Sequence, residues 1–340
     1  MVIRIQKSLV LFLFIFSLVP TVFAHTPLKP DGENNSLETA FEIPNPTKSW
    51  TLYRELHENG EAEYFKLHLH EGERFVVSVY IPRNAETDFI PNLIVIGPSI
   101  ENHSPTPTTI EVPDGAQATL IEGSLPEDPE YEPFTPASYY YTVDYRAEII
   151  DEGDYYFVVY SDEGEGRYGV AVGYIETFTL TEWLMIPIDV IVIHQWEGQS
   201  LTFILIPMAL TLVLGLFLLL WKFKPTVASI AVFLGVLAGL LYIGSGFMMG
   251  TQMFIALIGA TSTASLPLTL VFSFLPIVLG LAIIRKMVQH KLRWTTRDRI
   301  IVALFGILGF VLWAGVLIGP VVVIIVSILP AQKANFSSET

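Results

Sequence analysis

Residues 181–224 read TEWLMIPIDVIVIHQWEGQSLTFILIPMALTLVLGLFLLLWKFK, and this stretch decides how the chain is organised. The sequence before it is acidic and rich in tyrosine, whereas the sequence after it is almost entirely apolar. Residues 201–221 carry no charge over a length close to the roughly 20 residues that a helix needs to cross a bilayer. They end on Trp221 and are followed by Lys222, an aromatic and a basic residue typical of a membrane interface. The stretch therefore joins a domain in water to a domain in a membrane.

The first part of this stretch, residues 182–196, is apolar but too short to span a bilayer. Glu182 and Asp189 are one heptad apart, so a helix would turn both to water. Its other face would turn to lipid with Trp183, Ile186, Val190 and Ile193. We predict an interfacial helix within a linker over residues 179–200, with Trp183, Trp196 and Trp221 as membrane-interface anchors. The alternative is a hydrophobic linker packed under the soluble domain.

Residues 1–24 have the pattern of a secretory signal peptide. Arg4 and Lys7 form its basic region, an apolar core follows, and Val22-Phe23-Ala24 supplies a small-residue cleavage site. Cleavage there would leave His25 as the first residue, and the alternative is an uncleaved anchor helix. The chain has no cysteine, which excludes a disulfide framework and fits an exported prokaryotic protein.

Charge is distributed unevenly along the sequence. Residues 25–200 hold 32 Asp and Glu against 8 Lys and Arg, and the whole chain has a formal net charge of −15. A surface this acidic repels nucleic acid and anionic lipid head groups. The composition therefore argues against a nucleic-acid partner.

Residues 25–178 read as short strands separated by turns, with no long amphipathic helix. Residues 64–70 alternate cleanly, with Leu67 and Leu69 on one face and His68 and His70 on the other. Roughly eight strands of this kind in one domain predict an extracellular β-sandwich.

Two stretches of this domain resemble the pre-peptidase C-terminal domain of secreted and surface proteins in bacteria and archaea. They are GEAEYFKLHLHEGERFVVSVY (residues 60–80) and EGDYYFVVYSDEGEGRYGVAVGY (residues 152–174). The resemblance rests on Glu63-Tyr64-Phe65, on the turn at Gly72 and on Gly153-Asp154-Tyr155-Tyr156, and it covers less than half of the chain. It implies a jelly-roll-like β-sandwich with a binding or accessory role. The acidic pair before the tyrosine is Glu61-Ala62-Glu63 here, which departs from the family's usual Asp-x-Asp.

Candidate metal ligands are few. Side chains two apart on a strand share a face, so His68 and His70 could ligate one ion. An N-terminal His25 would chelate Cu(II) through its amino group and imidazole. The alternative for His68 and His70 is that they are ordinary solvent-facing residues of a strand. The alternative for His25 is that it belongs to a disordered terminus. We expect no cofactor, and the cations considered are copper and Ca²⁺, the latter at the acidic residues 127–132.

The sequence contains no HExxH, GxSxG or P-loop motif. No nucleophile lies at an interpretable spacing from a base. We therefore predict no catalytic residue and do not expect an enzyme.

Four apolar segments, at about residues 201–221, 226–247, 264–284 and 300–329, predict a transmembrane domain with a four-helix bundle. No Asp, Glu, Lys, Arg or His lies inside these segments, which argues against a pump or an ion-coupled transporter. Two glycine pairs are spaced for close helix packing: Gly235 with Gly239, and Gly315 with Gly319. Three methionines near the outer mouth could hold Cu(I) or simply pack: Met248, Met249 and Met253.

Basic residues set the predicted orientation. The loops at residues 222–224 and 285–299 hold eight Lys and Arg, so the positive-inside rule places them in the cytoplasm of a multi-pass plasma-membrane protein. The N-terminal domain and the tail, residues 330–340, are then predicted to lie outside. The sequons at Asn34, Asn102 and Asn335 fall on that side and are candidates for glycosylation.

Two hypotheses for function follow from this organisation. The first is a non-enzymatic cell-surface protein, anchored in membrane lipid, whose β-sandwich binds a surface glycan or another membrane or surface protein, as a subunit of a membrane complex. The second is an extracytoplasmic copper-handling protein that uses His25, His68 and His70 together with the methionines. The distance between the imidazoles of His68 and His70 tests the second hypothesis. Rings more than roughly 10 Å apart cannot share an ion, because metal–ligand bonds are only about 2.0–2.3 Å long.

Overall fold

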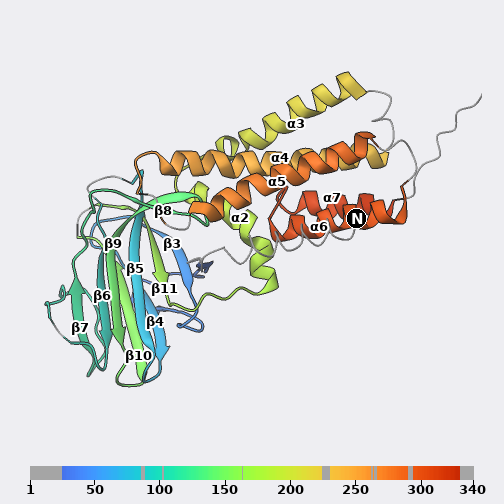
Figure 1. Ribbon diagram of the computed structural model, residues 1–340. Coiled ribbons are helices and arrows are strands. Elements are labelled where there is room, and N and C mark those ends of the chain that lie inside the picture. Colours follow the sequence, from blue (N-terminus) through green and yellow to red (C-terminus); the bar gives the residue numbers. More distant parts are fainter. Residues whose placement is uncertain are drawn as a thin grey trace, which may run out of the picture.

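Figure 1 shows the computed structural model of the chain, with a β-domain at one end and a set of helices extending from it. The structure describes residues 25–85, 89–101, 103–162, 164–223, 230–261, 263, 266–289 and 294–329. The predicted signal peptide (residues 1–24), the predicted tail (residues 330–340) and Asn102 lie outside the described residues.

The β-domain contains two mixed sheets, with the strand orders β1-β3-β11-β5-β9-β8 and β2-β4-β10-β6-β7. The strands are β1 (Thr26–Pro27), β2 (Phe41–Glu42), β3 (Trp50–Leu56), β4 (Ala62–Leu69), β5 (Arg74–Pro82), β6 (Asn92–Gly97), β7 (Gln117–Ile121), β8 (Glu130–Glu132), β9 (Ala137–Glu148), β10 (Gly153–Tyr160) and β11 (Gly166–Val172). The strands that the sequence does not predict are the shortest three, β1, β2 and β8.

The two sheets pack over a shared core because their strands alternate apolar and polar side chains. In β4, Leu67 and Leu69 are 1 % exposed, whereas His68 between them lies at the surface. Val79 and Val170 reach the same core from the other sheet. The alternation predicted for residues 64–70 is therefore confirmed, and it decides which side chains of β4 remain available for binding.

In the described part of the chain, six helices follow the β-domain. They are α2 (Leu180–Trp196), α3 (Leu201–Phe223), α4 (Ile230–Leu257), α5 (Leu266–Gln289), α6 (Thr296–Val311) and α7 (Ile318–Ile328). Three of them, α3, α4 and α5, are long and apolar enough to cross a membrane. Only 6 % of the apolar window of α3 is buried, against 61 % for α4, so α4 is central and α3 lies at the edge. Figure 1 shows α3 diverging from α4 along its length.

The apolar segment at residues 300–329 is not the single helix that the hydropathy pattern predicts. It is divided into α6 and α7, and the turn between them holds Trp313, Gly315, Val316 and Leu317 at positive φ. Arg299 in α6 donates to the carbonyl of Leu329, beyond the end of α7, at 2.8 Å. The chain therefore reverses, and both ends of this α6–α7 hairpin lie at the same end of the helical domain. At 16 and 11 residues, neither arm reaches the roughly 20 residues of a full span, so the predicted fourth span is replaced by a hairpin.

Glycines allow α4 to approach α5 closely. A Cβ atom at Gly239 would lie 2.9 Å from the carbonyl oxygen of Gly280 on α5, and a Cβ atom at Gly235 would meet the side chain of Met287. The first predicted glycine pair therefore lies at the contact between α4 and α5.

The second predicted glycine pair is divided between a turn and a helix. Gly315 lies in the α6–α7 turn at φ +71°, a conformation that glycine adopts without strain. Gly319 lies on α7, where a Cβ atom would be 2.7 Å from the ring of Tyr242 on α4. Its missing side chain thus allows the hairpin to pack against α4.

Helix α2 lies beside the β-domain and crosses the direction of α3, α4 and α5 (Figure 1). It begins with a capping box between Thr179 and Glu182, and Glu182 also pairs with Lys48 of the β-domain at 2.7 Å. Ile186 and Ile193 are 2 and 3 % exposed, so this face of α2 packs against protein. The prediction that these two side chains face lipid is wrong, because the β-domain and the helices together cover the apolar face of α2.

Adding a methyl group at Gly239 tests the α4–α5 contact. Gly239→Ala should lower the melting temperature of the detergent-solubilised protein by several degrees, because overpacking at a tight contact costs about 1–3 kcal/mol and exceeds the gain in helix propensity. Gly250→Ala on the same helix is the matched control, since no atom lies within 4 Å of the added Cβ. An unchanged or raised melting temperature for Gly239→Ala would contradict the packing described.

Candidate functional site

The β-domain and the helices meet in one contact region, here called the junction. It consists of the β8–β9 turn (residues 133–136), α2, the ends of α4 and α5 nearest the β-domain, and the α6–α7 turn. At its centre the ring of Trp313 lies 4.4 Å from Phe272, 4.7 Å from Trp183 and 5.3 Å from Phe134, measured between centroids. Each such pair contributes about 0.5–1.5 kcal/mol beyond the burial of its area. Four aromatic side chains from four segments thus hold the domains in contact.

Hydrogen bonds join β8 directly to the helical domain. Tyr131 donates to Oγ1 of Thr269 on α5 at 2.8 Å, and Thr269 donates to the carbonyl of Pro133 at 2.6 Å. The backbone of Thr261, just after α4, donates to the carbonyl of Pro129 at 2.9 Å. Because the first two bonds are buried, losing one partner would leave a polar group without water or protein to satisfy it.

A buried carboxylate lies just beyond the end of α2. Glu197 is 8 % exposed, accepts a hydrogen bond from Tyr139 at 2.6 Å through Oε1, and places Oε2 2.8 Å from Nδ1 of His194. Burial, together with the charge of Glu197, raises the pKa of Tyr139 well above its usual value of 10.0, so the phenol stays protonated and donates. A carboxylate only accepts, so Nδ1 of His194 carries the proton. The other ring nitrogen, Nε2, has no hydrogen-bond partner among the described residues.

His194 lines a cavity of about 40 Å³, here called the junction cavity. Its walls come from α2, α3, α4, α5, the β8–β9 turn and the α6–α7 turn, and they include Met248, Met249 and Trp313. Since one water needs roughly 10–15 Å³, the junction cavity has room for a very small ligand or an ion. Nε1 of Trp313 also lacks a hydrogen-bond partner within the described ranges. The junction cavity is thus largely apolar, with an imidazole nitrogen as its distinctive polar feature.

A second cluster lies on the surface where β4 ends and β10 begins, here called the surface cluster. Nδ1 of His68 is 2.9 Å from Asp154, and Nδ1 of His70 is 3.3 Å from Glu152. The two imidazole rings are 5.3 Å apart, and ligand atoms of His68, His70 and Glu152 lie within 4.8 Å of one another. Hydrogen bonding to Asp154 raises the pKa of His68 above its usual value of 6.5. Two imidazoles and a carboxylate at this separation are a suitable donor set for Zn²⁺ or Cu²⁺.

His25, the third histidine predicted as a metal ligand, lies apart from the surface cluster. It precedes β1, which belongs to the sheet that does not contain β4. Its Nδ1 is 2.5 Å from Oγ of Ser49, and burial lowers its pKa to about 4. The structure therefore brings His68 and His70 together, and the group that it forms around them contains Glu152 and not His25.

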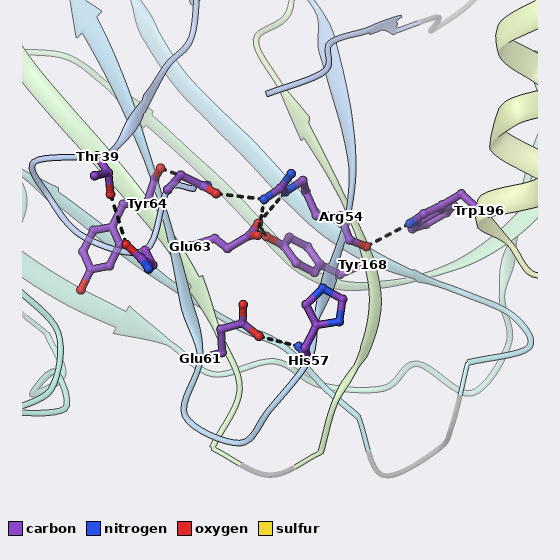
Figure 2. Close-up of polar contacts among 10 residues, drawn as sticks. Thr39, Arg54, His57, Glu61, Glu63, Tyr64, Tyr168 and Trp196 are labelled. Carbon is purple, nitrogen blue, oxygen red and sulfur yellow. Dashed lines mark hydrogen bonds and ion pairs between the residues drawn. The ribbon is translucent and has the colours of Figure 1, made fainter. Parts of the chain in front are cut away.

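The acidic residues that carry the family resemblance are engaged by their neighbours, as Figure 2 shows. Glu63 is 5 % exposed and accepts hydrogen bonds from Arg54 and Tyr168. Glu61 accepts a hydrogen bond from the backbone of His57. A cation at Glu63 would have to displace a guanidinium already paired with the carboxylate, so Glu63 is part of a structural ion pair.

The predicted glycosylation sites and two of the predicted interface tryptophans remain to be placed. Asn34 is 3 % exposed and its amide donates to the carbonyl of Tyr64 at 3.3 Å, so a glycan on it would have to displace the side chains that bury it. Trp196 donates to the carbonyl of Arg54 at 2.9 Å, which ties the end of α2 to the β-domain. Trp221 is 73 % exposed near the end of α3. Asn335 and Asn102 fall outside the described ranges.

His194, Glu197, Tyr139, Glu152 and Asp154 are residues of these sites that sequence reasoning missed. Glu197 follows His194 at a spacing of three, which places the two side chains on one side of a helical turn. That spacing is the one local signal available. The other three reach their partners through pairings across many residues, which no local pattern reveals.

The comparisons with known proteins give a limited result. The chain matches no family model. It also matches no curated protein. Among solved structures it is similar to the pre-peptidase C-terminal domain of a collagenase from Bacillus anthracis, at 14 % identity and a TM-score of 0.23. The match covers 39 % of this chain and 93 % of that structure. At this TM-score the likeness carries no argument about the site or its function.

Glu132 in β8 is predicted to make the free energy of unfolding depend on pH. Burial raises the pKa of this carboxyl from 4.5 to about 7, because the charged form is desolvated. A raised acid pKa favours folding when the group is protonated, so this contribution is complete below pH 4.5 and is lost as pH rises to about 7. Glu132→Gln should therefore flatten the free energy of unfolding between pH 4.5 and 7, measured by denaturant titration. Glu127→Gln, which changes an exposed carboxylate in the loop before β8, is the control, and identical profiles for the two variants would contradict the assignment.

Proposed function

We propose that the chain is a non-enzymatic membrane protein that holds its acidic β-domain in a fixed position outside the cell and serves as a binding or accessory subunit of a membrane complex. The junction is the observation that carries this proposal. A protein that only displays a domain needs a single span and a flexible tether. Here α2, two hydrogen-bonded strands and an aromatic cluster hold the β-domain on several helices. Such an arrangement suits a partner that contacts both domains at once.

Helix α3, the most exposed of the three spanning-length helices, is the observation that favours a partner within the membrane. The side chains of Leu214 and Phe217 on α3 are 57 and 65 % exposed, and only 6 % of the apolar window of α3 is buried. Lipid can cover such a surface, and so can the helix of another subunit, because helix association in a membrane depends on close packing. We propose that a partner helix lies on α3.

Two double variants test the partner on α3. Leu214→Ala with Phe217→Ala should remove a co-purifying chain from the particle isolated in mild detergent, because alanine keeps α3 apolar but removes the packing surface. Phe274→Ala with Val278→Ala on α5 is the matched control, since these side chains are 60 and 57 % exposed. A particle that contains only this chain before any substitution would contradict the proposal.

The α6–α7 hairpin changes the orientation proposed for the C-terminus. Because its two ends lie together, the chain after Leu329 leaves from the same end of the helical domain as the chain before Thr296. That end carries the basic loop at residues 285–299, which the positive-inside rule assigns to the cytoplasm. We therefore propose a cytoplasmic C-terminus in place of the external tail expected from four full spans.

A single cysteine can report on the location of the C-terminus, because the chain has none of its own. Thr340→Cys should react with a membrane-impermeant maleimide only after the cells are permeabilised. Ile150→Cys in the β-domain, where the native side chain is 69 % exposed, should react on intact cells and serves as the control. Labelling of both variants on intact cells would contradict the proposed orientation.

The surface cluster favours a second candidate function, capture of a divalent metal outside the cell. In the order of affinities for divalent ions, imidazole and carboxylate ligands bind Cu²⁺ most tightly. His68→Asn with His70→Asn should abolish binding of one Cu²⁺ per chain in a calorimetric titration, because both nitrogen donors are lost. His103→Asn removes another exposed imidazole, which pairs with Glu101, and should bind as the wild type does. Equal binding by all three proteins would contradict this function.

A further inference from the structure

His194 has the position and the hydrogen bonding of a metal ligand. Its side chain is 1 % exposed, and Nδ1 is turned to Glu197, which does not line the junction cavity. Nε2 is therefore the ring nitrogen left to face the cavity, and it has no hydrogen-bond partner among the described residues. Histidines that bind metals in proteins usually donate their other N–H to a carboxylate, which fixes the ring and strengthens the free nitrogen as a donor. Glu197 occupies that supporting position.

The charge of Glu197 favours a cation at the same place. A buried carboxylate is costly unless a positive group compensates it. Its two side-chain contacts are the neutral hydroxyl of Tyr139 and the ring of His194. A metal cation bound to Nε2 of His194 would compensate the charge of Glu197 through the imidazole ring. A proton on Nε2 would instead form an N–H group that has no acceptor among the described residues.

The cavity walls indicate which cation suits the site. Met248 and Met249 are consecutive residues of α4, and both line the junction cavity together with His194. Thioethers select soft ions such as Cu(I), and imidazole, a borderline donor, also binds copper, whereas Zn²⁺ and Cu²⁺ prefer nitrogen, oxygen or thiolate to thioether. The cavity of about 40 Å³ is large enough for an ion of this size and too small for an organic cofactor.

We infer that the junction cavity is a Cu(I) site with His194, Met248 and Met249 as ligands and Glu197 as a positioning residue. The inference rests on the second function proposed above, metal handling, and makes it more specific. The surface cluster offers donors for a divalent ion at an exposed site, whereas the junction cavity offers donors for a soft monovalent ion among largely apolar side chains. The two sites differ in ligands, burial and domain, so each can fail without the other.

The test uses the full chain in mild detergent with His68→Asn and His70→Asn already introduced, so that the surface cluster cannot contribute. Cu(I), kept reduced with ascorbate, is titrated in competition with a chromophoric Cu(I) chelator. We expect one Cu(I) per chain, and X-ray absorption at the copper edge should show sulfur and nitrogen neighbours. Adding His194→Gln, or Met248→Leu with Met249→Leu, should lower the affinity at least tenfold. Glu197→Gln should lower it by about 10- to 100-fold, as expected for the loss of a supporting carboxylate.

Met253→Leu is the matched control, because Met253 lies on the same helix but does not line the cavity, and its affinity should be unchanged. Leucine nearly conserves the volume of methionine, so the double methionine variant should keep its fold and its melting temperature. No uptake of Cu(I) by the folded background protein would overturn the inference. Equal affinity after His194→Gln, or in the double methionine variant, would overturn it as well. Either result would leave the Cu²⁺ titration of the surface cluster to decide the metal-handling function separately.

Discussion

The hydrogen bond from Tyr139 to Glu197 is the contact on which the relation between the two domains depends. Tyr139 belongs to β9, and Glu197 lies between α2 and α3, so one buried bond of 2.6 Å connects the sheet to the start of the first spanning-length helix. A hydrogen bond to a charged group contributes about 1.5–3 kcal/mol, because a buried carboxylate that loses a donor is left with an unsatisfied oxygen. The same carboxylate holds His194, so the position of the β-domain and the orientation of this imidazole are set together.

The junction also explains why α2 is not a simple membrane-surface helix. An apolar helix face is buried by whichever apolar surface lies nearest. For Ile186 and Ile193 that surface is protein, while Met185 and Val192 remain 41 and 40 % exposed on the same helix. Helix α2 is therefore shared between the two domains, and the α6–α7 turn reaches it through Trp313. Moving the β-domain would therefore require α2, α5 and the α6–α7 turn to rearrange together.

Much of this organisation could be predicted from the sequence. The period of two along residues 64–70 predicts that His68 and His70 share a face, and apolar length predicts the first three spans. The α6–α7 hairpin could not be predicted from hydropathy. Residues 313–317 are as apolar as the segments on either side of them, and a hydropathy pattern carries no information on the positive φ angles that form the turn. Glu152 and Asp154 reach the histidines through the pairing of β10 with β4, which depends on the whole sheet. Glu197 stands beside Gly198 and Gln199, a sequence without an apolar pattern, and its burial against Tyr139 is visible only in the structure.

The most direct test of a fixed junction is an engineered disulfide between the domains. Glu130 in β8 and Thr261 after α4 are paired by an isolated β-bridge, which brings their backbones as close as the Cα separation of about 4.4–6.8 Å that a disulfide requires. The chain has no other cysteine, so Glu130→Cys with Thr261→Cys gives an unambiguous measurement by mass and by mobility under non-reducing conditions. A fixed junction predicts that the disulfide forms nearly completely in the folded protein without loss of melting temperature. Two free thiols in a folded, oxidised sample would show that the β-domain is not held against the helices in this way.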